Sequence, residues 1–207
     1  MSSKVLVSLV FAACSGTGSP APAPTTRGPA TPTTAGLRGV ASFAAIADRA
    51  ERSRALFGEV ARVLTHPRCV NCHPSDDSPR QRDDHELHDP PVVRGPDNRG
   101  VPAMGCTSCH QLANAALARV PGAPDWHLAP REMAWLDRTP GQICAQLKDP
   151  ARNGNRTLAQ VVDHLGHDQL VAWGWAPGAD RAPAPGTQAE LAALAQAWVD
   201  SGAECPP

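Results

Sequence analysis

The residues with the clearest chemical potential are two copies of a Cys-x-x-Cys-His motif, at residues 69–73 and 106–110. Two thiols separated by two residues can form thioether bonds with the two vinyl groups of one porphyrin. The His that follows can then ligate the porphyrin iron from one side. We therefore predict two covalently bound c-type haems, with the two His residues as proximal iron ligands. The predicted attachment and proximal residues are Cys69, Cys72, His73, Cys106, Cys109 and His110.

Other uses of paired cysteines account for these motifs less completely. Two Cys-x-x-Cys pairs could bind one structural zinc ion, and each pair could instead form a disulfide or a redox-active dithiol. None of these uses needs a His directly after the second Cys, yet both pairs have one. The His repeated at the same position favours haem attachment.

The ligand on the opposite side of each iron has to come from elsewhere in the chain. A His or Met there suits electron transfer, whereas an open position suits catalysis or gas binding. We predict His88, stiffened by the two prolines that follow shortly after it, and His127, in a segment with Trp and Pro, as distal ligands. Met133 is the alternative. His164 and His167 share a helix face, and we expect a solvated or propionate-side role for them.

Three of the seven cysteines lie outside the motifs. Haem attachment of this kind takes place outside the cytoplasm, where disulfides persist. We therefore predict a disulfide between Cys144 and Cys205, with two buried free thiols as the alternative. Closing a loop of about 60 residues would stabilise the fold by about 4 kcal/mol in the chain-entropy model. Cys14 ends an apolar stretch typical of a bacterial lipoprotein signal, so we predict that it is lipidated; ordinary signal cleavage is the alternative.

Composition divides the chain into three parts. Residues 1–14 are the expected signal peptide. Residues 15–37 consist mainly of Ser, Gly, Pro, Thr and Ala, which predicts an extended, disordered tether. Residues 38–207 form the expected dihaem cytochrome c domain. The protein would then lie in the periplasm or cell envelope and meet the membrane only through its lipid anchor. A net charge of -1 with mixed signs gives no indication of nucleic-acid binding.

The predicted domain is mostly α-helical, rich in loops and organised around its two haems. Helical spacing of apolar residues, or a capping residue, predicts helices at 42–65, 111–118, 132–137, 140–148, 157–170 and 187–199. Thr139, Thr157 and Thr187 are the expected N-caps. Residues 74–103 show no periodicity and are expected to form a long loop. Aromatic residues make up only 4% of the chain, so bound haems would supply much of the apolar core.

Several stretches carry a resemblance to a known family: His66–Pro74, Pro90–Pro96, Val120–Pro130, Lys148–Gly154 and Trp173–Trp175. In these stretches the chain resembles bacterial dihaem cytochromes labelled as an isoquinoline 1-oxidoreductase subunit, over most of its length beyond the tether. The resemblance implies a periplasmic electron-transfer partner of molybdenum hydroxylases, enzymes that oxidise heterocycles or aldehydes. The chain has no molybdopterin or iron–sulfur signature, so the substrate chemistry is expected to lie in the partner.

Three classes of function follow from a haem protein of this size. We predict an electron carrier, and not an enzyme, between a periplasmic dehydrogenase or molybdenum hydroxylase and a further acceptor. The alternative is a dihaem peroxidase-like enzyme, which would keep one iron open and need an acid/base residue above it. A haem-based sensor would need a signalling domain, for which the sequence gives no indication.

Overall fold

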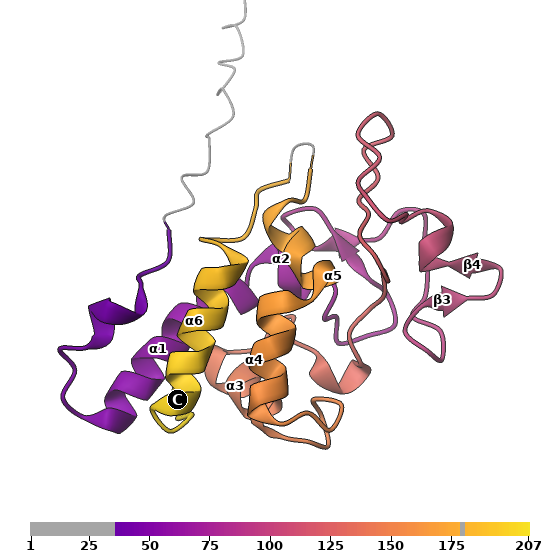
Figure 1. Ribbon diagram of the computed structural model, residues 1–207. Helices are drawn as coiled ribbons and strands as arrows, with labels where there is room; N and C mark the ends of the chain where they lie inside the picture. Colours follow the sequence, from indigo (N-terminus) through magenta and orange to yellow (C-terminus); the bar gives the residue numbers. More distant parts are fainter. Residues whose placement is uncertain (1–35, 179–180) are drawn as a thin grey trace, which may run out of the picture. The chain divides into compact units, whose positions relative to one another are not determined.

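The structure is a computed structural model that describes residues 36–178 and 181–207 (Figure 1). The predicted signal peptide, the predicted lipidation site Cys14 and nearly all of the predicted tether lie outside the described residues. The described part is mostly helical with long loops, which confirms the predicted mostly-α class. Within that part, no helix has the length and apolar character needed to span a bilayer.

The first helices differ from the prediction at their start. A short 3-10 helix, η1 (Val40–Phe43), precedes α1 (Arg49–Leu64), so the single helix expected over 42–65 is two elements. The side chain of Asp48 accepts a hydrogen bond from a backbone N–H in the first turn of α1 (2.7 Å). This cap begins a new helix because it satisfies a donor that has no partner within the helix. Gly58 lies inside α1 without interrupting it.

The second half of the chain supplies four more helices: α3 (Pro140–Lys148), α4 (Leu158–His167), α5 (Gln169–Ala172) and α6 (Gln188–Asp200). Thr139 and Thr157 each form a reciprocal capping box with the Gln three residues later. Thr187 caps α6 through its hydroxyl oxygen, so all three predicted N-caps are confirmed. The helix predicted over 157–170 ends earlier, because Asp168 caps the separate helix α5.

The helices enclose one hydrophobic core. Helices α1 and α6 lie side by side, and α4 packs against α6 (Figure 1). Large side chains that are fully buried in this core are Phe43, Phe57, Leu64, Ile143, Leu191, Leu194 and Trp198. The rings of Phe57 and Trp198 pack with their centroids 4.9 Å apart. Because α2 (Pro67–Val70) follows α1 directly, this rigid platform positions the first Cys-x-x-Cys-His motif.

Loops with only short elements connect α2 to α3. Two antiparallel pairs of two-residue strands lie near the predicted 74–103 loop: β1 (Arg80–Gln81) with β2 (Glu86–Leu87), and β3 (Gly100–Val101) with β4 (Met104–Gly105). The helix predicted at 132–137 is only a 3-10 turn, η3 (Arg131–Met133). These loops hold the second motif and most of the candidate iron ligands.

The helix predicted for residues 111–118 is wrong. The segment folds back on itself, with the Ala115 N–H donating to the Val120 carbonyl (2.9 Å) in an isolated antiparallel bridge. The side-chain oxygen of Asn114 accepts a further hydrogen bond from the Gly122 N–H (3.0 Å). The leucines of the segment are exposed, so a helix here would have no described surface against which to bury an apolar face.

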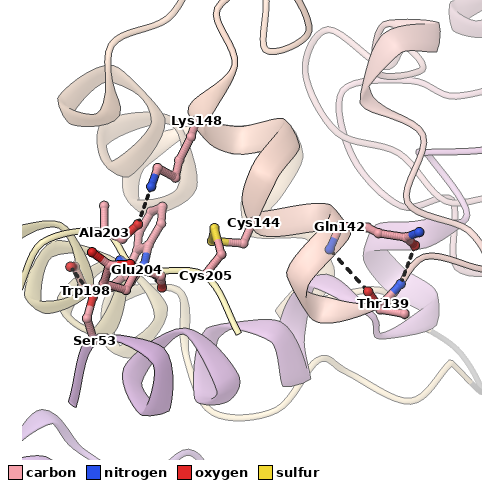
Figure 2. Close-up of a disulfide and its surroundings, with 9 residues drawn as sticks. All are labelled: Ser53, Thr139, Gln142, Cys144, Lys148, Trp198, Ala203, Glu204 and Cys205. Carbon is pink, nitrogen blue, oxygen red and sulfur yellow. Dashed lines mark hydrogen bonds between the residues drawn. A yellow bond between two sulfur atoms is a disulfide. The ribbon is translucent and has the colours of Figure 1, made fainter. Parts of the chain in front are cut away.

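A disulfide ties the C-terminal segment to the helices (Figure 2). Cys144 in α3 and Cys205 are joined, with their Cα atoms 5.6 Å apart, and this is the pair that the sequence predicts. The hydroxyl of Ser53 in α1 accepts a hydrogen bond from the Glu204 N–H (2.9 Å). Lys148 donates to a carbonyl of the same segment (2.7 Å). The C-terminus is therefore part of the packed fold.

Candidate functional site

The first motif is a tight turn at the end of α2. The Cys72 N–H donates to the Cys69 carbonyl (3.1 Å), and the His73 N–H donates to the Val70 carbonyl (3.0 Å). In a turn closed by i→i+3 hydrogen bonds, side chains three residues apart lie on the same side. Cys69 and Cys72 are three apart, so the turn carries both thiols on one side.

The imidazole of His73 is held from two directions. Its Nδ1 lies 2.7 Å from the Met133 carbonyl oxygen, which can only accept, so Nδ1 carries the proton. The ring also stacks on Trp135, with centroids 3.5 Å apart and planes 8° apart. With Nδ1 protonated, the lone pair of the neutral ring lies on Nε2. This is the tautomer that a metal-ligating His uses when its other nitrogen is anchored.

Burial keeps the first motif uncharged in the haem-free protein. It lowers the pKa of His73 to about 3, so the imidazole is neutral at ordinary pH. Burial also raises the pKa of the Cys69 thiol to about 12 and that of Cys72 to about 11. A neutral imidazole and two protonated thiols are therefore present at this turn.

The second motif is also a turn, although its surroundings differ. It begins with the 3-10 helix η2 (Cys106–Ser108), and the His110 N–H donates to the Cys106 carbonyl (3.0 Å). The Cys106 N–H donates to the Arg99 carbonyl (2.9 Å), which attaches the turn to the β3–β4 hairpin. Cys109 is exposed. This motif therefore lies on loops at the surface rather than on the helical platform.

The second imidazole repeats the arrangement of the first. His110 Nδ1 lies 2.8 Å from the Pro121 carbonyl oxygen, so it donates to that oxygen and the lone pair of the neutral ring lies on Nε2. Its ring stacks on Trp126, with centroids 4.5 Å apart and planes 9° apart. Trp126 in turn contacts Trp173 edge to face. Two unrelated chain segments thus reach the same result, an imidazole with a carbonyl behind it and an indole alongside it.

The structure brings the predicted distal ligand His88 to the second motif. The ring centroids of His88 and His110 lie 5.7 Å apart, with the ring planes at 74°. His88 Nδ1 donates to the Pro90 carbonyl (2.9 Å), so its free nitrogen is also Nε2. The pair therefore consists of two imidazoles whose Nδ1 atoms are both anchored by carbonyls.

The other predicted distal ligand, His127, follows Trp126, whose ring stacks on the His110 imidazole. His127 Nδ1 donates to the Asp125 carbonyl (2.5 Å). The pKa of His73, which burial lowers most, is lowered further by the charges of His164 and His127, with His164 the stronger of the two. His164 was expected to be solvated, and its Nδ1 lies 3.2 Å from a carboxylate oxygen of Asp168.

Met133, the alternative distal ligand, is buried within the helical core. Its carbonyl holds His73 Nδ1, which places its backbone on the side of the imidazole away from Nε2. A distal ligand has to approach the iron from the opposite side of the porphyrin. The position of Met133 favours its role as an anchor for His73.

The thiols of both motifs are available for haem attachment because none of them is part of a disulfide. Cys69, Cys72, Cys106 and Cys109 are all free, whereas Cys144 and Cys205 are joined. Among residues 36–178 and 181–207, no three His, Cys, Asp or Glu side chains form a group that could hold a metal ion. The free thiol pairs and the anchored imidazoles fit two porphyrins bound through separate turns.

Sequence reasoning missed the residues that support the motifs. The carbonyl anchors at Met133 and Pro121 leave no sequence signal, because every residue has a carbonyl. Trp135 and Trp126 could have been noticed as rare large aromatics after the second motif. Two buried arginines, Arg68 and Arg94, also lie beside the first motif and were not singled out.

We compared the chain with protein-family models, with curated proteins and with solved structures, and no match was found in any of the three comparisons. Its function has to be inferred from its own residues and their geometry.

Proposed function

We propose that the protein is an electron-transfer cytochrome that carries two covalently bound c-type haems. The observation that supports this most strongly is the anchoring of both motif imidazoles: His73 Nδ1 donates to the Met133 carbonyl and His110 Nδ1 to the Pro121 carbonyl. A structural disulfide pair or a redox dithiol would need neither anchor. A proximal iron ligand needs both its tautomer and its ring orientation fixed, and these contacts fix them.

The residues of each motif have separate tasks. Each Cys thiol would attach a haem by adding across a vinyl group: the sulfur would bond to one carbon and the thiol hydrogen would go to the other, so no atom would be lost. His73 and His110 would hold the iron through Nε2. The bound iron porphyrins would supply a one-electron couple between the ferric and ferrous states. The protein's own contribution is to attach, orient and shield the two centres.

The proximity of His88 and His110 supports electron transfer rather than catalysis at the second site. Both rings have Nδ1 anchored and Nε2 free, as two axial ligands of one iron would require. An iron with two imidazole ligands has no open position for a substrate. For the first site we propose His127 as the distal ligand.

The proposed partner is a periplasmic molybdenum hydroxylase or another dehydrogenase, from which electrons pass through this chain to a further acceptor. The support is the resemblance in the stretches named above together with the chemistry of the motifs. The disulfide agrees with a compartment outside the cytoplasm. We further propose that lipidation of Cys14 keeps the protein at the membrane surface of the cell envelope.

The proposal is tested by mass spectrometry of the full chain, produced in a bacterial host with cytochrome maturation machinery. Because thioether formation loses no atoms, the mature protein should carry the full added mass of two haems. A Cys106→Ala/Cys109→Ala variant should lose one increment. The matched control, Cys144→Ala/Cys205→Ala, should keep both, because that pair forms the disulfide. A mature protein without haem mass would overturn the proposal.

Carbon monoxide separates the carrier from the peroxidase-like alternative. If both irons have two protein ligands, the reduced protein should show no spectral change when the gas is added. A change at one of the two sites would show an open iron, and the assignment as a simple carrier would then be wrong.

A further inference from the structure

Two buried guanidinium groups flank the first motif. The side chain of Arg68, next to Cys69 in the chain, is 2% exposed, and that of Arg94 is 5% exposed. A buried charge is costly unless it is fully paired and hydrogen-bonded, so two such cations in one region need an explanation. Both lie beside the first motif: Arg68 is next to Cys69, and Arg94 bonds the Pro74 carbonyl that follows His73.

Both cations act on the residues of the first motif. The Arg68 guanidinium opposes the burial that raises the pKa of the Cys69 and Cys72 thiols. It also lies 5.9 Å from the centre of the Trp173 ring. Arg94 donates to the Pro74 carbonyl (3.2 Å), directly after His73, and its charge adds to the burial that lowers the pKa of His73. Each guanidinium is therefore electrostatically coupled to the site.

The positive charges of these two groups are incompletely balanced. Arg68 pairs with the carboxylate of Asp83, which is 54% exposed, so water screens part of its charge and it balances Arg68 only in part. Arg94 Nε lies 3.9 Å from a carboxylate oxygen of Asp77, which is also exposed. Within the described chain, neither Nε has a hydrogen-bond partner. A net positive field remains in a region of low dielectric constant, where it acts strongly.

The second motif has charges of a different kind. Its neighbour Arg99 is 48% exposed and forms two hydrogen bonds with the carboxylate of Asp125, so the pair is balanced and hydrated. Arg181, which also acts on His110, is partly exposed. Cys109 is exposed as well. Water screens the field at this motif far more than at the first.

We propose that Arg68 and Arg94 make the first motif the higher-potential site of the two, so that an electron delivered at the more exposed second motif passes to the first one. This inference rests on the proposed function. Adding one electron lowers the positive charge of an iron centre, so a buried cation nearby favours the reduced form. The electron comes from the redox partner. When it passes between the sites, the iron bound by His110 is oxidised and the iron bound by His73 is reduced.

The sharpest test removes the counter-charge rather than the cation. Asp83→Asn leaves Arg68 in place and removes its exposed partner, so the folded structure should be preserved. In a redox titration of the full protein, we expect the higher-potential wave to move upward, with the lower wave unchanged. A threefold change in the one-electron equilibrium corresponds to about 28 mV. Asp84→Asn is the matched control, since it removes the same charge from the next residue without touching Arg68.

Removing the cation should have the opposite effect. Arg68→Gln should lower the potential of the higher-potential wave by about 59 mV, which is a tenfold change in the one-electron equilibrium. Arg68→Lys keeps the positive charge, so its potential should stay close to that of the parent protein. Arg99→Gln, at the exposed pair, should move either wave much less. If Arg68→Gln does not fold, the sign of the Asp83→Asn shift still decides the question.

The outcomes separate the two proposals. A protein without two haem increments refutes the proposed function itself. A protein with both increments refutes only this inference if the Asp83→Asn shift is absent, is downward, or falls on the lower wave.

Discussion

Each motif imidazole is anchored by a chain segment far from it in sequence. His73 takes its anchor from the turn that contains Met133, and His110 takes its anchor from Pro121. A ligand held in this way cannot rotate or change tautomer without breaking a hydrogen bond. The orientation of the two proximal nitrogens is therefore built into the folded chain.

The role of His88 can be tested at the level of one side chain. His88→Ala removes the ring that faces His110 and should open the iron at the second motif. We expect the reduced variant to bind carbon monoxide at one of its two haem sites, whereas the parent protein binds none. His167→Ala is the control, because His167 is exposed and pairs with Asp163 (2.9 Å). A variant indistinguishable from that control would remove His88 from the site.

Asp168 predicts a dependence of stability on pH. Hydrogen bonds from His164 and from the Val171 and Leu170 N–H groups lower the pKa of Asp168 to about 2, against 3.8 for a free side chain. A depressed carboxyl pKa stabilises the fold above pH 4, and this stability is lost as the pH falls from about 4 to 2. Because the side chain is partly exposed, we expect a contribution of about 1–2 kcal/mol.

Urea unfolding at pH 5 and pH 2.5 measures this contribution. Asp168→Ala should destabilise the protein at pH 5 and lose less stability on acidification than the parent. Asp163→Ala is the control, since its pair with His167 is exposed on both sides and should matter little. An equal loss on acidification in the parent and Asp168→Ala would contradict the assignment.

The roles of single residues were predictable where they follow from motif spacing or from the number of cysteines left outside the motifs. The Cys144–Cys205 pair followed from the cysteines left outside the motifs, and the structure joins it. The supporting residues were not predictable in this way. Arg68 and Arg94 look like any surface arginine in the sequence, and only the tertiary fold buries them.

Elements were predictable where a cap fixes them locally. Thr139 and Thr157 start their helices with capping boxes that lie within four residues of sequence. The helix prediction for residues 111–118 was wrong because side-chain and backbone hydrogen bonds across a turn outweigh the helical composition of the segment. Loop structure depends on such nonlocal partners, which residue periodicity does not record.

Gly122 tests how the 111–122 turn positions the second motif. An added Cβ would lie 2.3 Å from the Ala113 carbonyl oxygen and 2.5 Å from that of Gln111, both backbone atoms that cannot yield cheaply. Gly122→Ala should therefore displace the preceding Pro121 carbonyl and loosen His110. We expect a spectral change at one haem and a loss of about 1–3 kcal/mol in unfolding free energy.

Gly58→Ala is the contrasting substitution at the same scale. Gly58 is exposed within α1, and no atom lies within 4 Å of an added Cβ. Replacing a helical glycine with alanine reduces the entropy lost on folding, so the variant should gain about 0.5–1 kcal/mol. Thermal unfolding of both variants compares them directly. Equal destabilisation by the two changes would contradict the close approach at Gly122.

At the scale of the whole molecule, a helical platform supports a layer of loops. The core formed by α1, α3, α4 and α6 contains most of the large buried side chains, and the first motif begins in α2, directly after α1. The second motif lies in loops with few buried residues. The haem-free protein should therefore keep its helices while the loops around residues 98–128 become mobile, which hydrogen exchange can show.

The disulfide contributes to the stability of the helical platform. Cys144 and Cys205 are separated by 61 residues, and their bond restricts the unfolded chain by about 4 kcal/mol in the chain-entropy model. Cys144→Ala/Cys205→Ala should lower the unfolding free energy by that order, measured by denaturant titration of the holoprotein. Its haem content should stay at two, because the motif thiols are separate from this pair. The Ser53 and Lys148 contacts to the C-terminal segment remain in the variant, so its folded structure should persist at lower stability. A midpoint equal to that of the parent protein would show that these contacts alone hold the segment.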